Sequence, residues 1–198
     1  MKARRSLNEA LGFSPVKLPD CPNNSPSRNL TGTPRVTRDI AADLYNNIQK
    51  WNAWHIKGCR IVKQIASIKA NSGATYSSHL EEAVNELYSI VQNIRVHWEN
   101  LELLVNQTKA LYQLHGNDKP VFLSLSAASI ANLISDISTA YKKEFTMKEF
   151  ILENIAHEKN KDNAMFLAAC WTHQVNINDD ITFKLEALLV ETNHRPII

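Results

Sequence analysis

The chain has 198 residues, of which 44% are hydrophobic, and its 22 Lys and Arg residues against 20 Asp and Glu residues give a formal net charge of +2. This length and composition can form a buried core, but no apolar run approaches the ~20 residues that a transmembrane helix needs. Three widely spaced cysteines without a CxxC pair exclude a disulfide framework and a zinc finger, so a soluble intracellular protein is expected.

The first 36 residues are predicted to form a disordered basic tail. Five of the seven prolines lie there, and its apolar residues do not recur with a sustained period. Seven basic residues against two acidic ones give the first 38 residues a charge of 7 − 2 = +5, which leaves 15 − 18 = −3 for the remainder. Such a stretch buries too little apolar surface to offset its chain entropy.

Three proline-directed acceptors lie in this tail, at Ser14, Ser25 and Thr33. Lys17 and Arg28 stand three residues after the first two, an arrangement that favours phosphorylation by a cyclin-dependent kinase. Two alternatives stay open: Ser-Pro pairs arise from composition alone in such a tail, and its scattered basic residues could contact nucleic acid.

From Thr37 onward the apolar residues recur every three or four positions, which predicts a helix to about Lys69 with Thr37 as its N-cap. Gly58 in this helix is expected to be a site of close approach by a neighbour. A second helix is predicted between Ala74 and His115, where a 3.5-residue repeat runs without Gly or Pro. Two long helices joined by a short polar loop should pack as an antiparallel hairpin.

Three further helices are predicted after the break at residues 116–120, and they span about 126–157, 164–171 and 180–192. Residues 119–124 are the only candidate for a strand, and they are few. The fold class is therefore all-α: residues 37–198 form an elongated helical bundle built on the long hairpin, and this bundle is the interaction domain.

The body lacks a recognisable catalytic constellation. His55 and Cys59 lie four residues apart on one helix face and could supply two metal ligands, but no second pair accompanies them. Cys170 and His173 could pair a nucleophile with a base, although no orienting acid is evident. A structural role is favoured for all four, so no catalytic residue, metal or cofactor is predicted and the chain is not expected to be an enzyme.

Two groups of segments stand out from generic helix. The first comprises Ile40-Ala41-Ala42-Asp43, Ile48-Gln49-Lys50-Trp51 and Ile65-Ala66-Ser67-Ile68-Lys69, and the second comprises Trp171-Thr172-His173-Gln174, Leu185-Glu186 and Glu191-Thr192-Asn193-His194-Arg195. Together they resemble the cyclin-dependent kinase 2-interacting protein family, and the chain looks like a divergent member of it. Asn193 stands where the family tends to have glycine. That departure is mild, because asparagine also adopts the left-handed conformation after a helix.

The resemblance implies a non-enzymatic nuclear adaptor, with the cytoplasm as a second location. The expected adaptor links cell-cycle kinases, DNA replication and checkpoint signalling, and it is a component of an AAA ATPase assembly in ribosome biogenesis and replisome turnover. The implied partners are a cyclin-dependent kinase, replication and checkpoint proteins and AAA ATPase subunits, with nucleic acid contacted only indirectly and no membrane. The candidate partner-binding residues are Trp171, His173, Gln174, Glu191, Thr192, His194 and Arg195. The alternative function is that of a nucleic-acid-binding factor acting through the basic tail.

Overall fold

The structure is a computed structural model that describes residues 30–72, 78–115, 120–122 and 124–195. The chain divides into two units between Leu30 and Thr31, and all the helices described below lie in the second, Thr31–Ile198. The predicted acceptors Ser14 and Ser25 lie outside the described residues. Within the described ranges, no helix is both long and apolar enough to span a bilayer.

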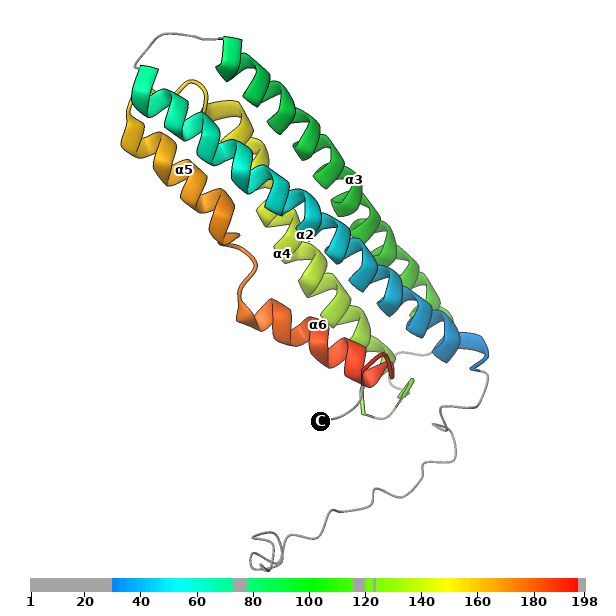
Figure 1. Ribbon diagram of the computed structural model, residues 1–198. Coiled ribbons are helices and arrows are strands. Elements are labelled where there is room, and N and C mark those ends of the chain that lie inside the picture. Colours follow the sequence, from blue (N-terminus) through cyan, green and yellow to red (C-terminus); the bar gives the residue numbers. More distant parts are fainter. Residues whose placement is uncertain (1–29, 73–77, 116–119, 123, 196–198) are drawn as a thin grey trace, which may run out of the picture. The chain divides into compact units, whose positions relative to one another are not determined.

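Two long helices form the predicted antiparallel hairpin. Helix α2 (Gly32–Ser72) has 41 residues and helix α3 (Ser78–His115) has 38, so they are roughly 62 and 57 Å long at 1.5 Å per residue. Figure 1 shows them running side by side in opposite directions. The all-α prediction and the elongated bundle built on this hairpin are confirmed.

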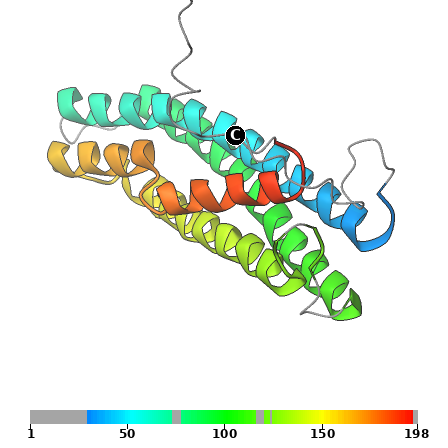
Figure 2. The same cartoon turned by 90° about the horizontal axis from the view of Figure 1, so that it is seen from below.

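Three shorter helices complete the bundle. Helix α4 (Ala127–Asn154) packs along α3, whereas α5 (Lys161–His173) lies mainly against α2, and α6 (Asp179–Glu191) lies mainly against α4. Figures 1 and 2 show α5 and α6 following one another end to end. The fourth position of a four-helix bundle is therefore shared by two short helices, with a connection between them at residues 174–178.

The predicted start of the first helix was wrong. Helix α2 begins at Gly32, five residues before the predicted N-cap Thr37, and its φ of +66° lies in the left-handed region that glycine adopts without strain. Thr37 is buried inside the helix, and its hydroxyl lies 3.0 Å from the Tyr112 hydroxyl of α3. Thr33, the third predicted acceptor, therefore lies in the first turn of α2.

Capping side chains set the starts of the three shorter helices close to the predicted positions. Ser126 caps α4 by accepting from the Ser129 N–H, Asn160 caps α5 by accepting from Asp162, and Asn178 caps α6. The strand considered for residues 119–124 is not formed in the described part of that segment, which has only an isolated bridge between Pro120 and Ser126.

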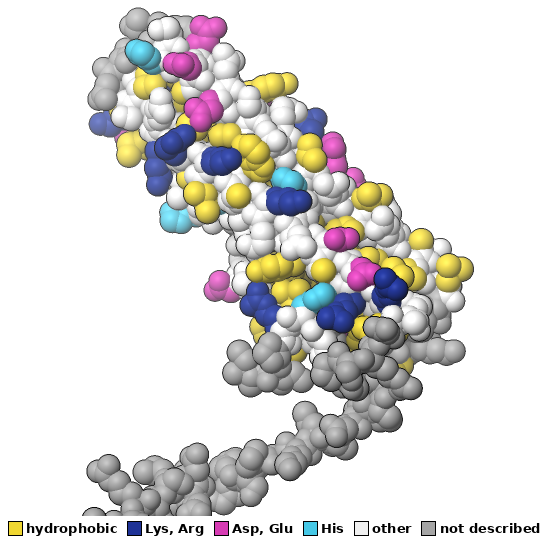
Figure 3. Space-filling model, turned by 45° about the vertical axis from the view of Figure 1, so that its right-hand side comes forward, with side chains coloured by type: hydrophobic (Ala, Val, Ile, Leu, Met, Phe, Trp, Pro, Cys, Tyr) yellow, Lys and Arg dark blue, Asp and Glu magenta, His cyan; other side chains and the backbone are white. Residues whose placement is uncertain are grey.

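The core fills the space between the helices with their apolar stripes, and both Trp51 and Trp171 are fully buried in it. Gly58 of α2 faces the Trp171 indole of α5, where a Cβ atom would come within 2.6 Å of Cε2, so the predicted close approach at Gly58 is confirmed. On the face drawn in Figure 3, basic and acidic side chains are interspersed rather than gathered into a patch of one sign.

Candidate functional site: a pocket at the C-terminal end of the bundle

The C-terminus of α6 ends in a tight hydrogen-bonded turn. Asn193 adopts a left-handed conformation with φ of 58°, as the asparagine at this position predicts. The His194 N–H donates to the Leu189 carbonyl at 2.8 Å, and the Asn193 N–H donates to the Val190 carbonyl at 3.1 Å. This pair of bonds is a Schellman motif, and it turns the chain back toward the bundle.

Two of the candidate residues in this segment point inward. The Glu191 carboxylate accepts hydrogen bonds from the Ser124 N–H and hydroxyl, both at 2.8 Å, and from the Leu125 N–H at 2.9 Å. Thr192 is fully buried, and its hydroxyl donates to the Leu188 carbonyl at 2.8 Å. Glu191 and Thr192 therefore hold the α3–α4 connection and the end of α6 in place, and neither is presented at the surface.

The next two residues join α6 to α2. The half-buried His194 donates from Nε2 to the Arg38 carbonyl at 2.8 Å. The Arg195 guanidinium lies 3.0 Å from a Glu186 carboxylate oxygen and 3.3 Å from the Tyr45 hydroxyl, and it also stacks over the Tyr45 ring. Arg195 is exposed, so its contacts form one edge of a surface feature.

The segment at the end of α5 is held by two buried tryptophans. Trp171 donates from Nε1 to the His55 carbonyl at 3.2 Å, and Trp51 donates to the Gln174 side-chain oxygen at 3.0 Å. Gln174 adopts a left-handed conformation with φ of 45°, which ends α5 and turns its amide toward α2. His173, the remaining candidate, is exposed on α5.

These segments surround one pocket of about 410 Å³. We call it the C-terminal pocket, and its lining comprises Tyr45, Ile48, Gln49, Asn52, Ile137, Tyr141, Gln174, Ile177, Ile181, Thr182, Leu185, Glu186 and Arg195. Isoleucine and leucine side chains supply the apolar part of its wall, whereas hydroxyl groups, amides and one ion pair supply a polar part of similar size. The break between α5 and α6 forms part of the wall. Such a mixture suits an apolar side chain together with the polar backbone that carries it.

Four of the segments that carry the family resemblance contribute side chains to this pocket. Gln49 comes from α2, Gln174 from the α5–α6 connection, Glu186 from α6 and Arg195 from the C-terminal turn. Tyr45, Asn52 and Thr182 also line it and were not singled out in the sequence. Their polar side chains on helix surfaces gave no signal that distinguishes them from solvated positions.

A buried polar cluster lies between α2, α4 and the α5–α6 connection. Lys148 and Glu144 are both completely buried and form an ion pair of 3.0 Å, and the ammonium also lies 4.2 Å from the centre of the Trp171 ring. Glu144 accepts from the backbone and side-chain amides of Asn176, each at 3.2 Å. Burial lowers the pKa of Lys148, which the attraction of Glu144 offsets in part. The cluster therefore anchors the connection that forms one wall of the C-terminal pocket.

His55 and Cys59, which were considered as metal ligands, belong to the same cluster. Lys148 donates from Nζ to His55 Nδ1 at 3.3 Å, so Nε2 carries the ring proton and faces Cys59 Sγ at 3.5 Å. A fixed ammonium against the imidazole disfavours a bound cation. In the parts of the chain that the structure covers, no three metal-ligating side chains gather, and no hydrogen bond joins Cys170 to His173.

The His55 imidazole makes the stability of the bundle sensitive to acid. Burial, and then the charge of Lys148, lower the pKa of His55 from 6.5 to about 4. The folded state therefore favours neutral His55. Above pH 6.5 the histidine is neutral in both the folded and the unfolded chain, and the folded state keeps its full stability. As the pH falls toward 4 the unfolded chain binds a proton at His55 that the folded chain does not, so the folded state loses stability. Integrated over that window, the loss amounts to roughly 3 kcal/mol at most.

This dependence is measurable by urea unfolding between pH 4 and 8. The His55→Gln variant keeps an acceptor for Lys148 but cannot titrate, so the difference between its profile and that of the unchanged chain isolates the histidine. We expect the two profiles to diverge below pH 6.5. If stability depends on pH in the same way in both proteins, His55 is not the group that makes the bundle sensitive to acid.

Comparisons with known proteins place these features in context. No protein-family model matches the chain. Three curated relatives, each named cyclin-dependent kinase 2-interacting protein, are similar to it. The Xenopus laevis protein is 26% identical over 192 residues, covering 85% of this chain and 93% of that protein. The Mus musculus protein is 25% identical with the same coverage, and the Bos taurus protein is 27% identical over 84% of this chain and 92% of its own length. The similarity thus extends over most of both chains.

Proposed function

Because the chain is a divergent member of the cyclin-dependent kinase 2-interacting protein family, we propose that it is a non-enzymatic adaptor that binds protein partners through the C-terminal pocket. The observation that carries this proposal is that residues from α2 and from the chain's C-terminal part, all within segments that resemble the family, line one pocket. Helix packing alone requires only the apolar side chains that face the core. It does not require Gln49, Gln174, Glu186 and Arg195 to surround a common depression.

The finer functional assignment is part of the same proposal. The adaptor acts in the nucleus, with the cytoplasm as a second location, and it links cell-cycle kinases to DNA replication and checkpoint signalling. It is also a subunit of an AAA ATPase assembly that acts in ribosome biogenesis and replisome turnover. Support for these roles comes from the family resemblance, and support for cyclin-dependent kinase contact also comes from the acceptors Ser14, Ser25 and Thr33.

Arg195→Ala tests the pocket directly. Arg195 and Glu186 are 44% and 40% exposed, so loss of their ion pair should cost less than about 1 kcal/mol of folding stability. Binding of the full chain to the purified cyclin-dependent kinase 2–cyclin complex, measured by surface plasmon resonance, should weaken at least about tenfold. The same measurement with recombinant AAA ATPase subunits in place of the kinase complex shows which of these two proposed partners binds at the pocket.

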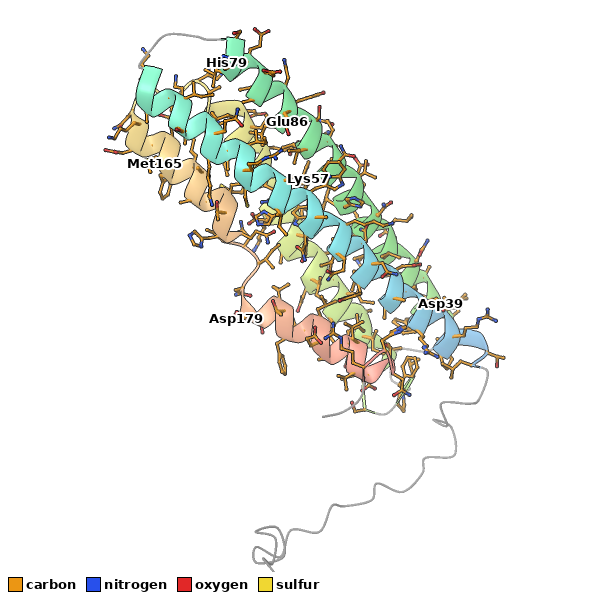
Figure 4. The ribbon with its side chains drawn as sticks, in the orientation of Figure 1. Asp39, Lys57, His79, Glu86, Met165 and Asp179 are labelled. Atoms are coloured by element: carbon orange, nitrogen blue, oxygen red, sulfur yellow. The ribbon has the colours of Figure 1, made fainter. Side chains whose placement is uncertain are left out.

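The matched control is Arg60→Ala, which removes another exposed ion pair, between Arg60 of α2 and Glu86 of α3 at 3.4 Å. Figure 4 labels Glu86 on α3, away from α6. Equal binding by both arginine variants and the unchanged chain would exclude the C-terminal pocket as the binding site. Strong unfolding of Arg195→Ala would show instead that Arg195 is structural.

A further inference from the structure

A second depression, of about 710 Å³, lies between α2 and α5 and is separate from the C-terminal pocket. We call it the α2/α5 trough. Small side chains form most of its lining, from Ala66, Ser67 and Ala70 of α2 and from Ala168, Ala169 and Thr172 of α5. Lys63, Met165 and His173 complete the lining. Two antiparallel helices with small residues on their facing surfaces thus leave a furrow that their own side chains do not fill.

The shape of the trough suits a third helix. Small residues let a neighbouring helix approach to the ~8–10 Å spacing of packed helices, with its larger side chains placed between the two rows. Met165 at the margin is 56% exposed, and the adjacent Phe166 is 66% exposed, so apolar surface is available on the α5 side. Figure 4 labels Met165 on α5 beside the C-terminal part of α2. Helix α5 has 13 residues, so the contact is about four turns long.

The charges of the trough define the character of the occupant. Among the described residues that line it there is no Asp or Glu, whereas Lys63 is exposed on the α2 margin and His173 on the α5 margin. Lys63 forms no ion pair within the described ranges of the chain, unlike Arg60 one turn earlier. An occupant with acidic side chains flanking its apolar ridge complements these margins, and a basic one does not. The chain's own residues 1–31, which precede α2, carry five basic side chains against two acidic ones, a charge of 5 − 2 = +3, and are thereby disfavoured as the occupant.

We propose that the α2/α5 trough is a docking site for an amphipathic helix of another protein, with large apolar residues facing Ala66 and Ala169 and acidic residues facing Lys63. The site is independent of the C-terminal pocket. An adaptor with these two sites holds two partners on different parts of one bundle.

A pair of designed peptides of about 18 residues, roughly five helical turns, tests the proposal on the full chain. Both carry leucine on one helical face, and they differ only in having glutamate or lysine at the flanking positions. Fluorescence anisotropy should show the glutamate peptide binding about fivefold or more tightly than the lysine peptide. Lys63→Glu should abolish or invert that preference, whereas Ala169→Trp, which fills the trough from an exposed position, should remove binding of both peptides.

Two controls keep the result interpretable. Ala53→Trp places the same bulk at another exposed position of α2 and should leave binding unchanged. Arg195→Ala should also leave it unchanged, so failure of the trough and failure of the C-terminal pocket are distinguishable. The proposal is overturned if neither peptide binds, if Ala169→Trp binds as the unchanged chain does, or if Ala169→Trp instead dissociates a dimer in sedimentation velocity, which would make a second copy the occupant.

Discussion

Gly58→Ala should lower the free energy of unfolding by about 2–3 kcal/mol, although the same change in an ordinary helix interior raises it by nearly 1 kcal/mol. The sign reverses because the new methyl group would overlap the Trp171 indole, only 2.6 Å from Cε2. The indole cannot retreat easily, since Nε1 donates to the His55 carbonyl and one face of the ring meets the Lys148 ammonium. Urea unfolding followed by circular dichroism measures the effect.

Removing the indole supplies the control. Trp171→Leu should itself cost about 2–4 kcal/mol by leaving a cavity. In that background, however, Gly58→Ala should become neutral or stabilising, because the atom it collides with is gone. Equal effects of Gly58→Ala in both backgrounds would show that the α2–α5 contact is not formed as described.

Lys148→Met is expected to destabilise the bundle by about 3–5 kcal/mol, the largest effect of any single change considered. It leaves the completely buried Glu144 carboxylate without the ammonium that lies 3.0 Å away. Asn176 still donates to that carboxylate, but two amide donors do not replace a neutralising charge. Differential scanning calorimetry and urea unfolding both measure the loss.

The double variant Glu144→Gln with Lys148→Met distinguishes a charge effect from a packing effect. It removes both charges and keeps an oxygen that can accept from Asn176, so it should recover most of the lost stability. Arg60→Met, which breaks an exposed pair with Glu86, provides the reference and should cost less than about 1 kcal/mol. A Lys148→Met variant no less stable than Arg60→Met would contradict the description of the cluster.

The helices were predictable because their signals are local. The apolar periods and the polar breaks located α2 to α6, and the left-handed conformation of Asn193 was predictable from its residue type. The start of α2 was not predictable, because Thr37 has the side chain of an N-cap but is a buried partner of Tyr112. That choice depends on a residue 75 positions away.

The candidate site was only partly predictable, for a related reason. Glu144 and Lys148 are four residues apart, a spacing typical of solvated ion pairs on helix surfaces, and only the packing of Trp171 and Asn176 against them makes the pair buried. Gln174 and Arg195 were singled out by resemblance. Their common pocket emerges from the placement of α5 and α6 end to end along the hairpin.

Hydrogen–deuterium exchange of the full chain, alone and with the purified cyclin-dependent kinase 2–cyclin complex, tests the central claim most directly. Binding at the C-terminal pocket predicts slowed exchange in three segments that line it, namely residues 45–52, 174–186 and the turn ending at Arg195. Exchange in the part of α3 around Glu86 should stay unchanged. Slowed exchange confined to α3 or to residues 1–29, with these three segments unaffected, would contradict a role for the C-terminal pocket in partner binding.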